Sequence, residues 1–227
     1  MNIKSLLSAR VIAGAMLLAL VGVAQVATGR EVGVPLPKPA VDAPVAPGTR
    51  EDTAVFAGGC FWGVEAVFRH VKGVHAAVSG YAGGSKPSPS YEEVSTGSTG
   101  HAESVSVRYD PSVVSYGELL QIFMSVAHNP TELNRQGPDH GTQYRSAIFY
   151  RTPEQQKAAQ AYIAQLNATH AFPAPVVTEV TPLTRFYPAE DYHQDYLAQH
   201  PYQPYIVYND APKLDDLKKL YPDRYQR

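Results

Sequence analysis

The chain has 227 residues, with 19 Lys and Arg against 21 Asp and Glu for a formal net charge of −2, and 44% of its residues are hydrophobic. This balance argues against a nucleic-acid binder, which would carry a basic excess, and against a generally disordered chain. The single cysteine, Cys60, excludes an intrachain disulfide, a CxxC redox pair and a cysteine-rich zinc cluster.

The first 24 residues have the zones of a secretory signal peptide. Lys4 and Arg10 precede an uncharged apolar run over 11–24, which ends in the small residues of a cleavage site. The run is shorter than the ~20 residues that a membrane-spanning helix needs. We therefore expect cleavage after Ala24 and a periplasmic or secreted protein, which meets a membrane only through this segment if it stays uncleaved.

Residues 25–52 contain prolines at positions 35, 37, 39, 44 and 47. Proline interrupts helices and strand ladders and favours an extended, polyproline-like backbone. We expect this segment to be a semi-rigid linker that precedes one compact domain over 53–227.

Within that domain, hydrophobic periodicity and capping residues predict the element order β-α-β-β-α-β-α-β. The expected strands cover 53–56, 74–81, 103–109, 144–150 and 175–181, and the expected helices follow Cys60 and cover 115–128 and 152–169. This order indicates an α+β fold with a ferredoxin-like split βαβ core of two layers. From about residue 187 onward many tyrosines stand among polar residues, so we expect a C-terminal extension that wraps the domain.

Cys60 lies at the junction of the first strand and the first helix, directly after Gly58 and Gly59. The free N–H groups and positive dipole end of a helix favour a thiolate there. Phe61 and Trp62 follow at a turn where small or polar residues are usual. These residues leave two interpretations open: an activated nucleophile beside an aromatic pocket, or a buried inert cysteine with two core aromatics.

Two polar loops are further candidates for a site. The loop over 90–103 ends in Glu103, whose carboxyl could be solvent-exposed or desolvated and kept protonated as an acid. The loop over 134–145 is too polar for a core and too long for a tight turn.

The histidines and acids of the chain raise two other possibilities, a metal site and a Cys–His hydrolase. A mixed metal site would draw on His101, Glu103, Asp139, His140 and His193. No pair of them has the HxxxH or HExxH spacing that places ligands on one helical face, so we expect no metal. A Cys–His hydrolase, with a histidine beside the cysteine, stays open.

Six motifs occur in order between residues 53 and 205: GGCFWG at 58–63, GYAGG at 80–84, TGHAE at 99–103, NRQG at 134–137, GTQYRS at 141–146 and YPAEDYHQ at 187–194. Together they resemble the A-type peptide methionine sulfoxide reductases. The resemblance implies reduction of the S epimer of methionine sulfoxide, free or in proteins, to methionine. It implies no bound metal or cofactor.

The resemblance also assigns roles to seven residues: the nucleophile Cys60, the acid Glu103, the oxygen-binding Tyr91 and Tyr144, the methyl-binding Phe61 and Trp62, and the polar Asp139. The chemistry agrees with this assignment. A soft thiolate can attack a sulfoxide sulfur only if the departing oxygen receives a proton, so the acid must be protonated beside the cysteine.

The chain departs from the family pattern in two ways, and the first bears on recycling. Many relatives carry a resolving cysteine near the C-terminus, and some carry one where this chain has Ser95. Relatives also often have Asp where this chain has Asn129. Without a second thiol, the sulfenic acid that forms on Cys60 must be reduced by an external thiol, which we expect to be a thioredoxin-like protein.

Two alternatives belong to other functional classes. The first is a non-enzymatic module that captures oxidised proteins through Phe61 and Trp62, although binding alone would not need the cysteine, the acid and both tyrosines. The second is a one-cysteine peroxidase, which would want an Arg and a Thr or Ser beside the thiol.

Overall fold

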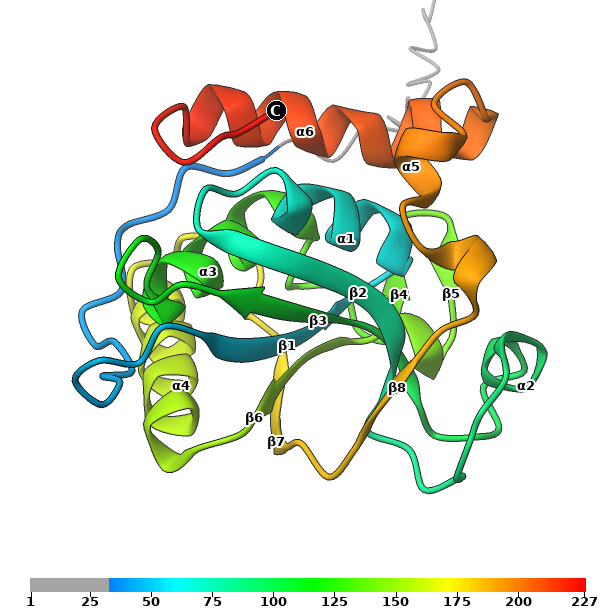
Figure 1. Ribbon diagram of the computed structural model, residues 1–227, viewed down its shortest axis with the longest axis horizontal. Coiled ribbons are helices and arrows are strands. Elements are labelled where there is room, and N and C mark those ends of the chain that lie inside the picture. Colours follow the sequence, from blue (N-terminus) through cyan, green and yellow to red (C-terminus); the bar gives the residue numbers. More distant parts are fainter. Residues whose placement is uncertain (1–32) are drawn as a thin grey trace, which may run out of the picture.

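The computed structural model describes residues 33–227 and is built around a six-stranded sheet with the strand order β7-β6-β1-β3-β2-β8 (Figure 1). Four antiparallel strands form its centre: β1 (Asp52–Gly58), β2 (Val74–Ala82), β3 (Ala102–Tyr109) and β6 (Ser146–Tyr150). The order β6-β1-β3-β2 places β3 between the parallel strands β1 and β2, as in a split βαβ unit. The predicted α+β fold class is confirmed.

Short strands extend the sheet at both edges. β7 (Glu179–Pro182) runs parallel to β6, and β8 (Phe186–Pro188) runs antiparallel to β2. A separate two-stranded hairpin is formed by β4 (Arg135–Gln136) and β5 (Asp139–His140). A 3-10 turn, η2 (Thr142–Tyr144), includes the first residue of the predicted fourth strand, which therefore begins later than expected, at Ser146.

The three predicted helices form, and two of them begin at a capping side chain. The main helices are α1 (Phe61–Arg69), α3 (Tyr116–Ile122) with its π-helical continuation η1 (Phe123–Ala127), and α4 (Pro153–Ala168). The side chain of Ser115 accepts a hydrogen bond from the Glu118 amide, and that of Thr152 accepts one from Gln155. One helix, α2 (Tyr91–Ser95), is a single short turn inside a predicted loop.

The two faces of the sheet are packed differently. On the helix-covered face, Phe56 of β1 stacks on Phe68 of α1 and on Phe123 of η1, with ring centroids 5.2 and 4.7 Å apart. On the other face a smaller cluster, which includes Val55 and Phe149, is covered by partly buried residues near β8. Aromatic packing between β1 and the helices thus anchors the strand that leads into Cys60.

The C-terminal extension covers α1 on the side away from the sheet (Figure 1). It consists of η3 (Asp191–His193), α5 (Tyr196–Gln199), η4 (Ile206–Asp210) and α6 (Ala211–Leu220). Ile206 and Leu217 are its fully buried apolar anchors. The extension wraps the domain, as its sparse apolar content predicts.

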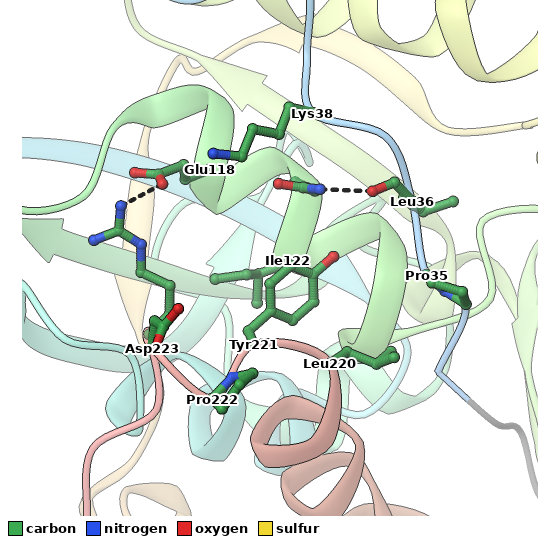
Figure 2. A pocket seen from close by; sticks show the side chains of 11 residues that line it. Pro35, Leu36, Lys38, Glu118, Ile122, Leu220, Tyr221, Pro222 and Asp223 are labelled. Atoms are coloured by element: carbon green, nitrogen blue, oxygen red, sulfur yellow. Dashed lines mark hydrogen bonds and ion pairs between the residues drawn. The ribbon is translucent and has the colours of Figure 1, made fainter.

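Residues 33–42, which we call the strap, lie along α3 and α4. The Val34 amide donates to the Ser125 carbonyl at 2.9 Å, the Gln121 side chain donates to the Leu36 carbonyl at 2.7 Å, and the Tyr162 hydroxyl donates to the Pro37 carbonyl at 2.9 Å. Figure 2 shows the strap, α3 and the C-terminal turn around one pocket. The described part of the predicted linker is extended, but it is docked on the domain rather than standing away from it.

Residues 1–32, which hold the predicted signal segment and its cleavage point, lie outside the described residues. Over 33–227 the structure contains no helix with the length and apolar character needed to cross a membrane.

Candidate active site

Cys60 is the N-cap residue of α1, at the point where β1 turns into the helix. Gly59 has a φ of +84°, and a Cβ there would lie 2.5 Å from the Gln136 side chain, so only glycine fits. Gln136 is itself held in place, because its Oε1 accepts the Asn129 amide at 2.8 Å and its Nε2 donates to Glu132 at 2.7 Å. The loop before the hairpin therefore sets the position of the cysteine.

All seven residues predicted for the site line one cavity of about 260 Å³. They come from α1, α2, β3, the β4–β5 hairpin and η2, and the C-terminal extension adds Gln203 and Tyr205, which the sequence motifs did not identify. The lining residues are Cys60, Phe61, Trp62, Tyr91, Glu103, Asp139, Tyr144, Gln203 and Tyr205. The fold brings the separate motifs together in space, which is the arrangement that a shared chemistry requires.

Glu103 is buried, with 2% of its surface exposed, and its Oε2 accepts a 3.0 Å hydrogen bond from the Phe61 amide. Burial raises the pKa of Glu103 to about 8, against the opposing effect of that hydrogen bond, and the charges of Asp139 and Asp210 raise it further. Glu103 therefore carries a proton at neutral pH. Of the two fates that the sequence left open for this carboxyl, the structure shows the desolvated acid.

Cys60 is 9% exposed, and burial raises the pKa of its thiol well above the ordinary value. The charge of Glu103, where that carboxyl is ionised, and the charge of Asp210 act in the same direction, while a hydrogen bond from the Trp62 amide lowers the pKa. The expectation that the helix start favours a resting thiolate is wrong for this site, because desolvation outweighs the contribution of the helix N-terminus. The raised pKa favours the thiol form of Cys60 at neutral pH.

Two tyrosine hydroxyls complete the polar side of the cavity. Tyr91 begins α2, and its amide donates at 2.9 Å to Glu190, which also accepts the Tyr81 hydroxyl at 2.8 Å. Tyr144 lies in η2. Burial raises the pKa of Tyr91 and of Tyr144, so both hydroxyls keep their protons and can donate to an oxygen in the cavity.

Aromatic rings form the apolar side. The Trp62 ring stacks on Tyr196 with centroids 3.8 Å apart and an interplanar angle of 7°, and it meets the edge of Tyr205 at 5.9 Å. Phe61 packs on Tyr81 at 5.9 Å and on His193 at 5.0 Å. This wall suits a small apolar group such as a methyl.

Asp139 connects the hairpin to the extension, because its carboxylate accepts a hydrogen bond from the Tyr205 hydroxyl. Burial raises the pKa of Asp139, and the hydrogen bond from Tyr205 lowers it. The contact closes the cavity between two segments that are distant in the sequence.

His101 and His193, which suggested a metal site or a Cys–His hydrolase, form hydrogen bonds elsewhere. His101 accepts the Gly84 amide at 3.1 Å through Nδ1 and donates to the Lys86 carbonyl at 2.8 Å through Nε2. Over 33–227 no group of three or more His, Cys, Asp or Glu residues is arranged to hold a metal ion. His193 accepts from Trp62 through Nδ1 while its Nε2 has no partner, so it is not bonded to Cys60 as a hydrolase base would be.

The two departures from the family pattern are accommodated locally. The Ser95 hydroxyl donates to the Tyr91 carbonyl at 2.7 Å within α2. Asn129 Oδ1 accepts from the amide and from the hydroxyl of Thr131, at 3.1 and 2.7 Å. An aspartate carboxylate would accept the same two bonds, so Asn129 preserves this turn.

The sequence profile of the family described as "Peptide methionine sulfoxide reductase" matches residues 52–225. The chain belongs to this family. Its members named MsrA include a protein of Mesorhizobium japonicum that is 60% identical over 185 residues, covering 82% of this chain and 94% of the relative. A second, from Synechocystis, is 53% identical over 191 residues, covering 83% and 89%.

Solved structures of methionine sulfoxide reductases share the fold. Mxr1 of Saccharomyces cerevisiae in its reduced form has a TM-score of 0.63 and 32% identity, and the match covers 74% of this chain and 93% of that one. Methionine sulfoxide reductase A of Corynebacterium diphtheriae has a TM-score of 0.59 and 37% identity, with 78% and 89% covered. The protein is therefore an oxidoreductase that reduces methionine sulfoxide.

Proposed function

We propose that this reductase acts on the S epimer of methionine sulfoxide, free or in proteins, through a sulfenic acid on Cys60 that an external thiol reduces. The observation that carries the proposal is the pairing of a protonated, buried Glu103 with Cys60 in one aromatic-lined cavity. Such a cavity suits a neutral substrate that has an apolar methyl on one side and a polarised S–O bond on the other.

In the first half-reaction the substrate methyl lies against Phe61 and Trp62, and the hydroxyls of Tyr91 and Tyr144 donate to the sulfoxide oxygen. As the Cys60 sulfur attacks the sulfoxide sulfur, the carboxylic acid protonates the oxygen. The thiol proton of Cys60 then replaces the proton that the acid has given.

Atoms and electrons balance in this first half-reaction. The attack forms a bond between the two sulfurs, and the protonated oxygen leaves as water with the protons of the acid and the thiol. A water molecule then attacks the Cys60 sulfur and returns a proton to Glu103, the S–S bond breaks, and methionine leaves as a thioether, which gives a Cys60 sulfenic acid. The cysteine sulfur loses two electrons and the substrate sulfur gains them.

Recycling follows from the cysteine count, because the chain has no second thiol. A dithiol reductant attacks the sulfenic sulfur and water leaves, which gives a mixed disulfide. The second thiol of the reductant then attacks that disulfide and frees Cys60. A thioredoxin-like protein supplies both thiols from one molecule.

The pattern of residues 1–24 supports repair of oxidised exported proteins as the biological setting. An exported enzyme meets little glutathione, which favours a protein dithiol as the reductant. Fractionation of cells that express the chain, followed by sequencing of its N-terminus, tests this setting. Cleavage after residue 24 and recovery outside the cytoplasm are the expected results.

The chemistry is tested by adding one equivalent of methionine-S-sulfoxide to the reduced protein without a thiol. We expect one equivalent of methionine, labelling of Cys60 by a sulfenate-specific probe, and further turnover only after a dithiol is added. Cys60→Ser should form no methionine, because a hydroxyl is neither ionised nor soft enough to attack sulfur. Repeated turnover without thiol, or equal rates on the R epimer, would contradict the proposal.

A further inference from the structure

Asp210 is a buried carboxylate that the proposed chemistry does not use. It ends η4 and precedes α6, and none of its surface is exposed. Its Oδ1 lies 3.2 Å from the ammonium of Lys213, one turn further along the helix, while its Oδ2 has no hydrogen-bond partner. A buried carboxylate with one oxygen unsatisfied is costly in free energy.

The Asp210–Lys213 pair lies against the first turn of α1. A Cβ on Gly63 would be 2.1 Å from Asp210 Oδ1 and 2.8 Å from Lys213 Nζ, so the carboxylate and the ammonium both lie against the Gly63 backbone. Gly63 is only three residues after Cys60. A carboxylate beside this turn offsets the positive end of the α1 dipole, which would otherwise stabilise a thiolate.

The groups that act on the thiol come from several elements. Three acids raise its pKa, in the order Glu103 of β3, Asp210 and Asp139 of β5, and the hydroxyls of Tyr91, Tyr144 and Tyr205 also line the cavity. The tyrosines are neutral and Glu103 is protonated at neutral pH, since its pKa is about 8. Of the remaining charges, that of Asp210 has the larger effect on Cys60 and that of Asp139 the smaller.

We propose that the carboxylate of Asp210, buried on the first turn of α1 and paired with Lys213, keeps the Cys60 sulfur protonated and slow to react with oxidants and alkylating agents. Burial raises the pKa of Asp210, and the Lys213 ammonium, 3.2 Å from Oδ1, opposes that rise and favours the charged form. Asp210 thus acts by placing a negative charge beside the first turn of α1. It acts on the nucleophile without lining the substrate cavity.

The test measures the rate of alkylation of Cys60 by iodoacetamide between pH 6 and 11. The chain has one cysteine, so the rate reports on that thiol alone. In Asp210→Asn we expect the midpoint of the pH profile to move down and the rate at pH 7 to rise about three- to tenfold, since one pH unit in the midpoint is a factor of ten in thiolate. Hydrogen peroxide should oxidise the variant faster by a similar factor.

The pH dependence of the alkylation rate distinguishes an effect of the Asp210 charge from a structural effect of the substitution. Loss of a purely structural contact would expose the sulfur, which would move the midpoint and also raise the rate at high pH, where every molecule is a thiolate. Loss of the charge alone should move the midpoint and leave the high-pH rate unchanged. Asp215→Asn, which neutralises an exposed acid on the same helix, is the matched control and should leave the profile unchanged.

A midpoint in Asp210→Asn that coincides with that of the wild type would overturn the proposal. If that variant does not fold, the double variant Asp210→Asn, Lys213→Met removes both charges of the pair, and its midpoint should also lie below that of the wild type. The assay needs no sulfoxide. Its outcome is therefore independent of the proposed substrate and mechanism.

Discussion

The indole Nε1 of Trp62 donates a 3.1 Å hydrogen bond to Nδ1 of His193. Because Nδ1 is the acceptor, the neutral imidazole carries its proton on Nε2. Burial lowers the pKa of His193, which keeps the ring neutral and the bond intact at neutral pH. Trp62 is thereby fixed on one edge by His193 and on one face by Tyr196, which makes it a rigid wall of the cavity.

Truncation of this wall should weaken substrate binding. We expect Trp62→Ala to raise the KM for methionine sulfoxide by about five- to a hundredfold, because apolar contact with a methyl-sized group contributes roughly 1–3 kcal/mol. Trp62→Phe keeps an aromatic face but loses the bond to His193, so its effect should be smaller. Steady-state kinetics with Tyr202→Ala, a tyrosine 91% exposed on the same extension, provide the control. An unchanged KM in Trp62→Ala would remove the tryptophan from the binding site.

Glu103→Gln should lower the rate of the first half-reaction about 10²- to 10⁴-fold with little change in affinity, because an amide cannot supply the proton. The pKa of Glu103 is about 8, so the wild-type acid is protonated below that pH and the wild-type rate should fall as the pH rises through it. This descending limb should be absent from the variant.

Single-turnover formation of methionine between pH 6 and 9 measures both effects of Glu103→Gln. The exposed Glu92→Gln in α2 is the control and should behave as the wild type. A nearly full rate in the Glu103 variant would transfer the role of acid to Tyr91 or Tyr144.

His128 should make the protein sensitive to acid. It is buried behind the cysteine loop, with Nδ1 donating to the Phe123 carbonyl at 3.1 Å and Nε2 accepting from Ser146 at 2.6 Å. Burial lowers its pKa to about 3, whereas an unfolded histidine has a pKa of about 6.5. The unfolded state therefore binds more protons between these values, and stability is lost as the pH falls from about 6.5 towards 3.

This acid sensitivity can be measured by urea unfolding at pH 7 and pH 5. The wild type should lose roughly 2 kcal/mol of unfolding free energy through this group, at about 1.4 kcal/mol per pH unit below 6.5. His128→Asn should lose correspondingly less over the same interval. The exposed His140→Asn should follow the wild type. A pH dependence in His128→Asn as steep as that of the wild type would show that other groups carry it.

The strap should contribute to stability rather than act as a passive spacer. Gln121→Leu removes the donor to the Leu36 carbonyl and should cost about 1 kcal/mol of unfolding free energy. Removal of residues 33–42 breaks all such bonds together and should cost more. Chemical denaturation compares these chains with Gln160→Leu, an exposed control on α4. Equal stability with and without the strap would mean that its contacts contribute nothing.

Sequence patterns predicted the core topology because the central strands and α1 have an apolar period and because α3 and α4 begin at capping residues. The boundaries were less accurate where local hydrogen bonding decides them. Tyr144 belongs to a 3-10 turn rather than to a strand, and the helix that begins after Ser115 changes to π-helical geometry at Phe123. α2 was missed because five residues are too few to show a helical period.

Five of the seven site residues were predicted from motifs that are continuous in sequence, and Tyr91 and Asp139 from the wider family resemblance. All seven line one cavity. Tyr205 and Asp210 were missed because their places depend on how the extension folds back over α1. The protonation of Cys60 was misjudged for a related reason. A sequence shows that a helix starts at the cysteine, but it does not show how completely the surrounding elements exclude water.

The burial of Cys60 in a cavity of about 260 Å³ has a consequence for the order of events during turnover. In the proposed chemistry the sulfoxide and the reducing thiol must both reach the same sulfur, so they compete for one site. Methionine must leave before the reductant enters, so the enzyme alternates between two forms and never binds both partners together. Methionine that stays bound in the cavity should therefore compete with the reductant. Accumulated methionine should first slow the step in which the external thiol reduces the Cys60 sulfenic acid.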